Sequence, residues 1–188
     1  MFSDRIILGI DPGTNIMGYG LLHISGKEMK LLDLGLLHLS KLENNPLKLK
    51  KIFETAITLI EQHKPDELAI EAPFYGKNIQ SMLKLGRAQG VAIAAALYKN
   101  IPITEYSPKK IKQSLTGNGN ASKEQVAAML KTLLHFTETP KHLDATDALA
   151  AAVCHYFQTS GRANSESKKS YSGWKAFLVE NPARKIDR

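Results

Sequence analysis

Four carboxylates stand where predicted strands end or a predicted helix begins. Asp11 closes the apolar run of a first strand, and Glu71 closes a later one. Asp144 and Asp147 are spaced i, i+3 at the start of a helix, so they share one of its faces. Ionised carboxylates at the edge of a core repel one another and are costly to bury unless a cation neutralises them. Oxygen ligands of this kind suit Mg²⁺ or Mn²⁺, so the four residues predict a divalent metal site.

Each acid also has a purely structural interpretation. Asp144 and Asp147 could cap their helix and complement its dipole. Asp11, which precedes a Pro-Gly pair, could form an Asx turn. Glu71 could be an ordinary exposed residue at a strand end. The conjunction favours chemistry, because one fold would bring all three segments to the same edge of a sheet.

The elements that must position these acids follow one another in a defined order. Short turns join three strands, which should therefore be antiparallel neighbours: 5–11, 19–25 and 29–39. Helices and two further strands complete the order: helix 46–63, strand 67–73, helix 78–98, strand 101–106, then helices 107–115, 123–134 and 143–158. This order predicts an α/β protein with a ribonuclease H-like mixed sheet, three antiparallel strands followed by two parallel strands, and helices on both faces.

The composition limits the class of protein. The chain has 188 residues, 43% of them hydrophobic, which is enough for one folded domain with a real core. Its net charge of +7 favours a polyanionic partner, with nucleic acid first, although a basic protein without such a partner fits equally well. The single cysteine, Cys154, excludes an internal disulfide and a Cys-rich zinc site. Without a leader pattern or a long apolar run, we expect a cytoplasmic protein with no membrane association.

The composition changes near residue 159. Residues 159–188 hold 7 Lys/Arg and 3 Asp/Glu, so more than half of the net positive charge lies in this last stretch. The stretch is rich in Ser, Gly and Lys, which is typical of a flexible segment. We therefore predict one folded domain over 1–158 and a basic, flexible tail over 159–188.

Several stretches together resemble one known family. They are LGIDPGT at 8–14, AIEAPFYGKN at 69–78, LKLGRAQGVAIAAA at 83–96, EYSPKKIKQSLTGNGNASKEQV at 105–126 and DATDALAAAVCH at 144–155. In this order they resemble the RuvC-type crossover junction endodeoxyribonucleases, the Holliday junction resolvases. The resemblance spans nearly all of 1–158, which would then be the nuclease domain.

The resemblance implies a complete catalytic site. Asp11, Glu71, Asp144 and Asp147 match the family's catalytic and metal-binding acids. The implied enzyme is a homodimer that uses Mg²⁺, two ions per active site with Mn²⁺ as a substitute, to nick two strands of a four-way DNA junction symmetrically. The implied products are ligatable 5′-phosphate and 3′-hydroxyl ends, formed in DNA recombination and repair. Asp11 is the best candidate to bridge both metals, because a carboxylate at a strand end is held rigidly.

The resemblance also implies residues that hold DNA. Phe74 matches an aromatic residue that wedges into the junction and stacks on a base, with Tyr75 as a second candidate. Lys112 and Lys123 match positions that contact the DNA backbone near the cut. The structural alternatives are a core position for Phe74 and a solvated helix face for the lysines. His142, two residues before an acid, could supply a proton or a ligand, although a loop histidine is more often incidental.

Two kinds of protein partner follow from the same resemblance. Part of the helix over 78–98 would form the dimer interface, with Met82, Leu83 and Leu85 as possible contacts. A two-fold symmetric junction suits a two-fold symmetric enzyme. The family works beside a branch-migration helicase complex, so such a partner is implied as well.

Three other functions share parts of this pattern. A catalytically inactive junction-binding protein could keep the same scaffold, although the presence of all four acids argues against it. Another nuclease of the same superfold could act on RNA–DNA hybrids or flaps. Sugar kinases and actin-like ATPases share the GIDPGT strand and turn, but they need a second domain and further glycine-rich motifs.

Overall fold

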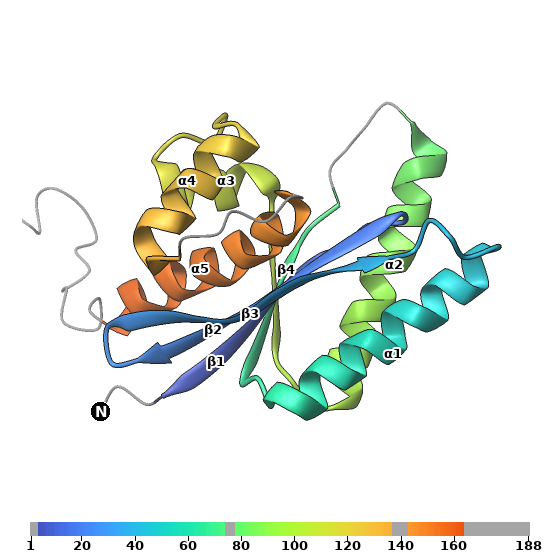
Figure 1. Ribbon diagram of the computed structural model, residues 1–188, viewed down its shortest axis with the longest axis horizontal. Helices are drawn as coiled ribbons and strands as arrows, with labels where there is room; N and C mark the ends of the chain where they lie inside the picture. The colour runs from blue at the N-terminus through green and yellow to red at the C-terminus, as the bar shows by residue number, and fades with distance from the viewer. Residues whose placement is uncertain (1–3, 74–77, 137–142, 164–188) are drawn as a thin grey trace, which may run out of the picture. The chain divides into compact units, whose positions relative to one another are not determined.

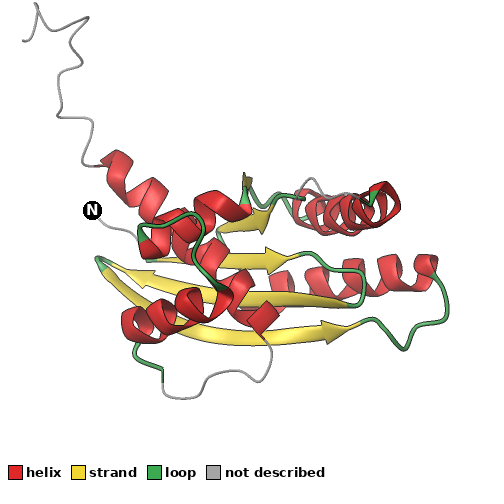
Figure 2. Ribbon diagram, turned by 90° about the horizontal axis from the view of Figure 1, so that it is seen from above, coloured by secondary structure: helices red, strands yellow, loops and turns green. Residues whose placement is uncertain are grey.

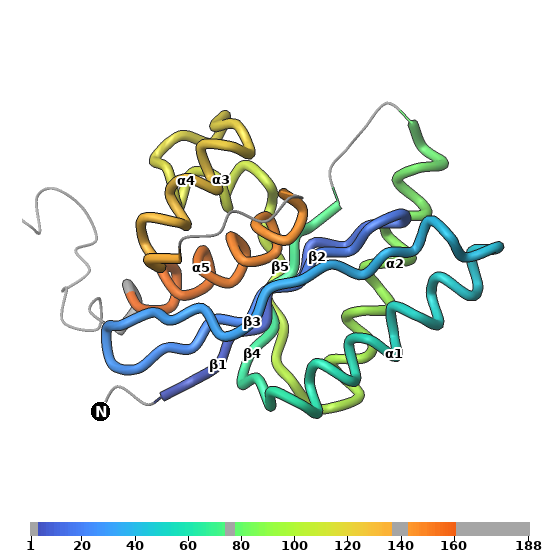
Figure 3. The backbone as a smooth tube through the Cα atoms, viewed as in Figure 1, coloured from blue at the N-terminus to red at the C-terminus, as the bar shows by residue number. Residues whose placement is uncertain are grey.

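The computed structural model describes residues 4–73, 78–136 and 143–163. Its five strands form one sheet in the order β3-β2-β1-β4-β5 (Figure 3). The strands are β1 (Arg5–Asp11), β2 (Ile16–Ser25), β3 (Glu28–His38), β4 (Glu67–Glu71) and β5 (Ile103–Tyr106). β1, β2 and β3 are antiparallel, whereas β4 is parallel to β1 and β5 is parallel to β4. The predicted mixed sheet is confirmed.

Five helices cover both faces of this sheet, as predicted (Figure 1). They are α1 (Asn45–His63), α2 (Ile79–Tyr98), α3 (Pro108–Thr116), α4 (Lys123–Leu134) and α5 (Leu143–Ala163). Leu8 and Ile10 of β1 belong to a core cluster with α1 and α2, while Ile7 belongs to a second cluster with α3, α4 and α5. β1 is thus buried on both faces, which explains its unbroken apolar run. Figure 2 shows the strands lying side by side between the helices.

Glycines let α5 lie unusually close to the sheet. A Cβ atom on Gly9 would stand 2.0 Å from the Ala148 carbonyl oxygen, and one on Gly18 would stand 2.1 Å from the Asp144 carbonyl oxygen. Such distances leave no room for any side chain. The glycines of β1 and β2 therefore allow the start of α5, where two of the four acids lie, to pack directly against the sheet.

We expect Gly18→Ala to destabilise the fold by at least about 2 kcal/mol, because the added methyl group must displace the backbone of α5. Urea unfolding measures this loss. Gly90→Ala is the matched control: no atom of the described residues lies within 4 Å of a Cβ at Gly90 in α2, so the change should leave the folded monomer equally or more stable. Equal stability of the wild type and Gly18→Ala would contradict the close packing.

A series of hydrogen bonds between polar side chains also holds α5 against the sheet. The Tyr106 hydroxyl lies 2.8 Å from His155 Nδ1, and His155 Nε2 lies 3.0 Å from Glu67 Oε2. Arg5 donates to both Glu67 carboxylate oxygens. The hydrogen bond with His155, aided by the Arg5 charge, outweighs burial and holds the pKa of Glu67 below its usual range. Polar groups that are satisfied in this way fix the position of a helix more specifically than apolar contacts do.

The helix starts match the capping signals in the sequence. Ser107 accepts a hydrogen bond from the Lys110 amide at the start of α3. Ser122 and Gln125 form a capping box at the start of α4. The box places Lys123 in the first turn of α4.

Two element boundaries differ from the prediction by more than two residues. β2 begins at Ile16 rather than at residue 19, because Ile16 and Met17 pair with the end of β3. α5 ends at Ala163 rather than at residue 158. The Thr-Ser-Gly sequence indicated an end, but extending an existing helix by a turn costs little compared with starting one.

Contacts divide the chain into two units, Met1–Phe157 and Gln158–Arg188. The site residues discussed below belong to the first unit. Within the part of the chain that the structure describes, no helix has the length and apolar character needed to cross a membrane.

Candidate active site

Three of the predicted acids form a compact group. Asp11 is the last residue of β1, and Asp144 and Asp147 lie at the start of α5. One carboxylate oxygen from each of them lies within 4.8 Å of the other two. This spacing allows a single ion to be held by all three residues.

Glu71 stands beside this group without belonging to it. It ends β4, which pairs in parallel with β1, so Asp11 and Glu71 close neighbouring strands at the same edge of the sheet. The two acids also share a small cavity of about 60 Å³, which is lined by Asp11, Pro12, Glu71, Ala72, Pro73, Leu85 and Gln89. The structure thus gathers all four predicted acids at one edge, with three of them in a tighter set.

The carboxylates are poorly neutralised by the protein itself. Burial, reinforced by the charges of Glu71 and Asp147, raises the pKa of Asp11 to about 8. Burial and the charge of Asp147 raise the pKa of Glu71 to about 7. Burial also raises the pKa of Asp147, even though Lys123 acts in the opposite direction. Raised carboxyl pKa values at an enclosed edge mark a place where a further positive charge is favourable.

Lys123 supplies part of that charge. Its Nζ lies 2.5 Å from Asp147 Oδ2 and 3.2 Å from Asp144 Oδ1, and its side chain is half exposed. Burial would lower the pKa of Lys123, but the hydrogen bonds and charges of the two aspartates outweigh it and raise that pKa. The charge of Lys112 in α3 partly offsets the rise in the pKa of Glu71 and of Asp147. Both predicted lysines therefore act on the acidic group.

The donor set fits a hard divalent cation. The ligands that the group offers are carboxylate oxygens, and no cysteine or histidine belongs to the described cluster. One ammonium group does not balance four acids, as the raised pKa of Asp147 shows despite its direct contact with Lys123. Mg²⁺ and Mn²⁺ both match this chemistry.

Gln89 contributes to the site and was not predicted. This buried side chain of α2 donates from Nε2 to the Glu71 carbonyl oxygen at 3.3 Å and to Glu105 Oε2 at 2.7 Å. It therefore ties the end of β4 to α2 and β5. Nothing in the sequence marks this glutamine as a neighbour of Glu71.

The remaining predicted residues are distributed as follows. Phe74, Tyr75 and His142 lie outside the described residues. On α2, Leu83 is exposed, whereas Met82 and Leu85 are half-buried, and Leu85 lines the cavity beside Asp11.

The family model and the related sequences that match this chain carry the same description. A family model described as crossover junction endodeoxyribonuclease RuvC matches residues 7–155. A relative of that name from Cytophaga hutchinsonii is 64% identical over 179 residues, which cover 95% of this chain and 87% of the relative. One from Bacteroides fragilis is 59% identical over 184 residues, which cover 97% and 96% of the two chains.

Solved structures agree with these sequences. Thermus thermophilus RuvC superposes with a TM-score of 0.76 at 30% identity, over 84% of this chain and 96% of the other. A structure described as T. thermophilus RuvC in complex with Holliday junction substrate gives a TM-score of 0.79 at the same identity and coverage. A yeast mitochondrial Holliday junction resolvase, at 15% identity and a TM-score of 0.63, shares the fold.

Proposed function

This chain belongs to the crossover junction endodeoxyribonuclease RuvC family, and we propose that it resolves four-way (Holliday) DNA junctions by metal-dependent hydrolysis of phosphodiester bonds. The observation that carries the proposal is the group of three carboxylates within 4.8 Å, with Glu71 beside it, at one edge of the sheet. The described site retains all four acids, so nothing in it favours the inactive junction-binding alternative.

The acids have distinct parts in this proposal. Asp11, Asp144 and Asp147 would together hold one Mg²⁺ ion, and Glu71 with Asp11 would hold a second, which makes Asp11 the shared ligand. When bound, such ions supply Lewis-acid activation of the scissile phosphate and of the attacking water. Gln89 holds the end of β4, and so the backbone of Glu71, in position.

The lysines and the loop after β4 would hold the DNA. Lys123 lies against Asp144 and Asp147, where it can reach a phosphate that approaches the acids. Lys112, whose charge reaches Glu71, would contact the backbone nearby. Phe74 and Tyr75 would stack on bases opened at the junction, a contact worth about 1–3 kcal/mol per base.

A symmetric dimer would place two such sites on one junction. The α2 helix exposes the large apolar side chains of Ile79 and Leu83, and no atom in the described part of the chain lies within 4 Å of a Cβ at Gly86 or Gly90. An open, partly apolar helix face of this kind suits a second copy of the chain. A branch-migration helicase complex is the further partner that we propose from family membership.

The decisive experiment uses end-labelled synthetic four-way junctions, with one mobile and one fixed core, in Mg²⁺ and in EDTA. Paired, symmetric, ligatable nicks that require the metal would establish the function. Linear duplexes and RNA–DNA hybrids of the same length are the controls. Tight junction binding with no cleavage in Mg²⁺ or Mn²⁺, across several core sequences, would instead support the inactive alternative.

Junction binding should weaken steeply with salt. Each neutralised phosphate releases counterions, so a surface that contacts six or more phosphates loses about 10³-fold in affinity between 50 and 200 mM salt. Electrophoretic mobility shifts in EDTA measure this without cleavage. A nearly flat salt response would rule out the basic surface as the platform for DNA.

A further inference from the structure

A second cavity lies beside the catalytic edge, between the turn after β1 and the starts of α1 and α2. Figure 1 shows α1 and α2 on the face of the sheet opposite to α3 and α4. Its volume is about 390 Å³, within the range of clefts that hold small ligands. Residues from three segments line it: Thr14, Asn15, Leu42, Glu43, Asn44, Asn45, Lys48, Ser81 and Lys84. Leu42 is the one apolar residue among them, and none of the described residues of the lining is aromatic, so this lining suits a charged group better than a base.

The cavity is joined directly to the catalytic edge. Thr14 and Asn15 belong to the turn that follows Asp11. Lys48 of α1 donates from Nζ to the Thr14 carbonyl oxygen at 3.1 Å and to Asn15 Oδ1 at 3.5 Å. An ammonium group has three N–H donors, so Lys48 is held against the turn with one donor left for a ligand.

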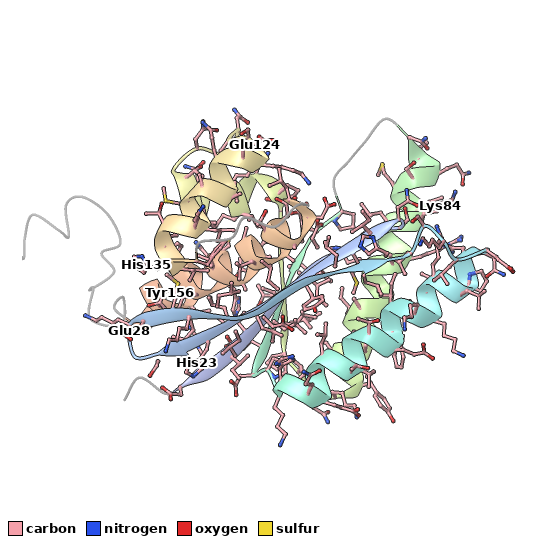
Figure 4. All side chains as sticks on the ribbon, viewed as in Figure 1. His23, Glu28, Lys84, Glu124, His135 and Tyr156 are labelled. Carbon is pink, nitrogen blue, oxygen red and sulfur yellow. The ribbon has the colours of Figure 1, made fainter. Side chains whose placement is uncertain are left out.

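Lys84 supplies the second positive charge. It is exposed on α2, where Figure 4 labels it. No hydrogen bond or ion pair engages its ammonium group within the described residues. Among the described residues that line the cavity, Glu43 is the single acid, so the charges of Lys48 and Lys84 outweigh it. α1 and α2 both begin at the cavity without an acidic residue in their first turns, which adds a favourable potential for an anion.

We propose that this cavity binds a backbone phosphate of the DNA substrate, through Lys84 and Lys48, on the side of the active site away from Lys112 and Lys123. The proposal rests on the junction-cleaving function and specifies where the substrate strand runs. Asp11 and Thr14 are three residues apart, which is at most about 10 Å of extended chain. Lys48 Nζ lies 3.1 Å from the Thr14 carbonyl oxygen, so a phosphate held there would lie a few nucleotides along the strand from the cut.

The test measures junction binding by the full chain in EDTA at 50 and 200 mM salt. For Lys84→Gln, the slope of log affinity against log salt should decrease by about 1, so its deficit relative to the wild type is roughly threefold larger at 50 mM than at 200 mM. Lys84→Arg should behave almost as the wild type. Lys51→Gln, which makes the same charge change on α1 outside the cavity, is the matched control.

Single methylphosphonate substitutions then locate the contact. One neutral linkage a few nucleotides from the cut should weaken binding by the wild type but not by Lys84→Gln. Unchanged binding by Lys84→Gln, or an equal methylphosphonate effect in both proteins, would overturn the proposal. Loss of binding by Lys84→Gln together with loss of its self-association in sedimentation would also overturn the proposal, since Lys84 would then act through the dimer.

The wild type separates this proposal from the proposed function. If the wild type neither binds nor cuts junctions, the proposed function itself fails. If it does both, failure at Lys84 concerns this cavity alone.

Discussion

Asp144→Asn is expected to abolish junction cleavage while junction binding is retained. The change removes a negative charge and an oxygen ligand from the group formed with Asp11 and Asp147. Metal assistance to phosphoryl chemistry is worth several kcal/mol, so the single-turnover rate should fall by about 10³-fold or more. Binding should persist, because the substitution removes negative charge from a surface that faces a polyanion.

The measurement pairs cleavage of an end-labelled junction in Mg²⁺ with mobility shifts in EDTA. Asp4→Asn, an exposed acid at the start of the described chain, is the matched control and should cleave normally. A cleavage rate for Asp144→Asn within tenfold of the wild type would contradict the metal site. Parallel loss of binding and cleavage would mean that Asp144 acts through the packing of α5 on Gly18.

The acidic edge was predictable because its causes are local. Strand periodicity places Asp11 and Glu71 at the ends of β1 and β4, and parallel neighbours bring their carboxyl ends to one edge. Helix periodicity then puts Asp144 and Asp147 on one face. These rules act within single segments and their turns, and they also make the first three strands antiparallel. The pairing of β4 with β1, and the position of α5 beside their ends, followed from the order of the elements and not from a local pattern.

Other features depend on how distant elements pack, and the sequence pattern does not contain that information. The contact of Lys123 with Asp144 and Asp147 requires the first turn of α4 to face the start of α5. The contact of Gln89 with Glu105 depends on the rotation of α2 against β5. The sequence contains the capping box that puts Lys123 in the first turn of α4. It does not show that this turn faces the acids.

In the absence of divalent metal, the fold should become less stable as the pH rises from 6 to 8. The cause is the raised pKa of Asp11, about 8, and of Glu71, about 7, for which burial is the main reason. An unfolded chain releases these protons near pH 4, whereas the folded chain keeps them up to pH 7–8. The folded state therefore binds more protons across this window, and its free energy of unfolding falls as the pH increases.

The size of the effect follows from the same shifts. One group contributes about 1.4 kcal/mol per pH unit while it is protonated only in the folded state. From pH 6 to pH 8 Asp11 alone should reduce the free energy of unfolding by about 2 kcal/mol. Asp11→Asn removes this contribution, so the variant should be more stable than the wild type at pH 8 in EDTA although it cannot hold the metal in the same way.

Urea unfolding in EDTA at pH 6, 7 and 8 tests this, with Asp4→Asn as the control that should follow the wild type. The difference between wild type and Asp11→Asn, rather than either curve alone, isolates Asp11 together with its coupling to Glu71 and Asp147, because titrating groups elsewhere contribute equally to both. Adding Mn²⁺ at pH 8 should stabilise the wild type and leave Asp11→Asn nearly unchanged, since a bound cation replaces the protons. Parallel pH dependences for the wild type and Asp11→Asn would show that Lys123 already neutralises Asp11. The inference that this edge carries excess negative charge would then be wrong.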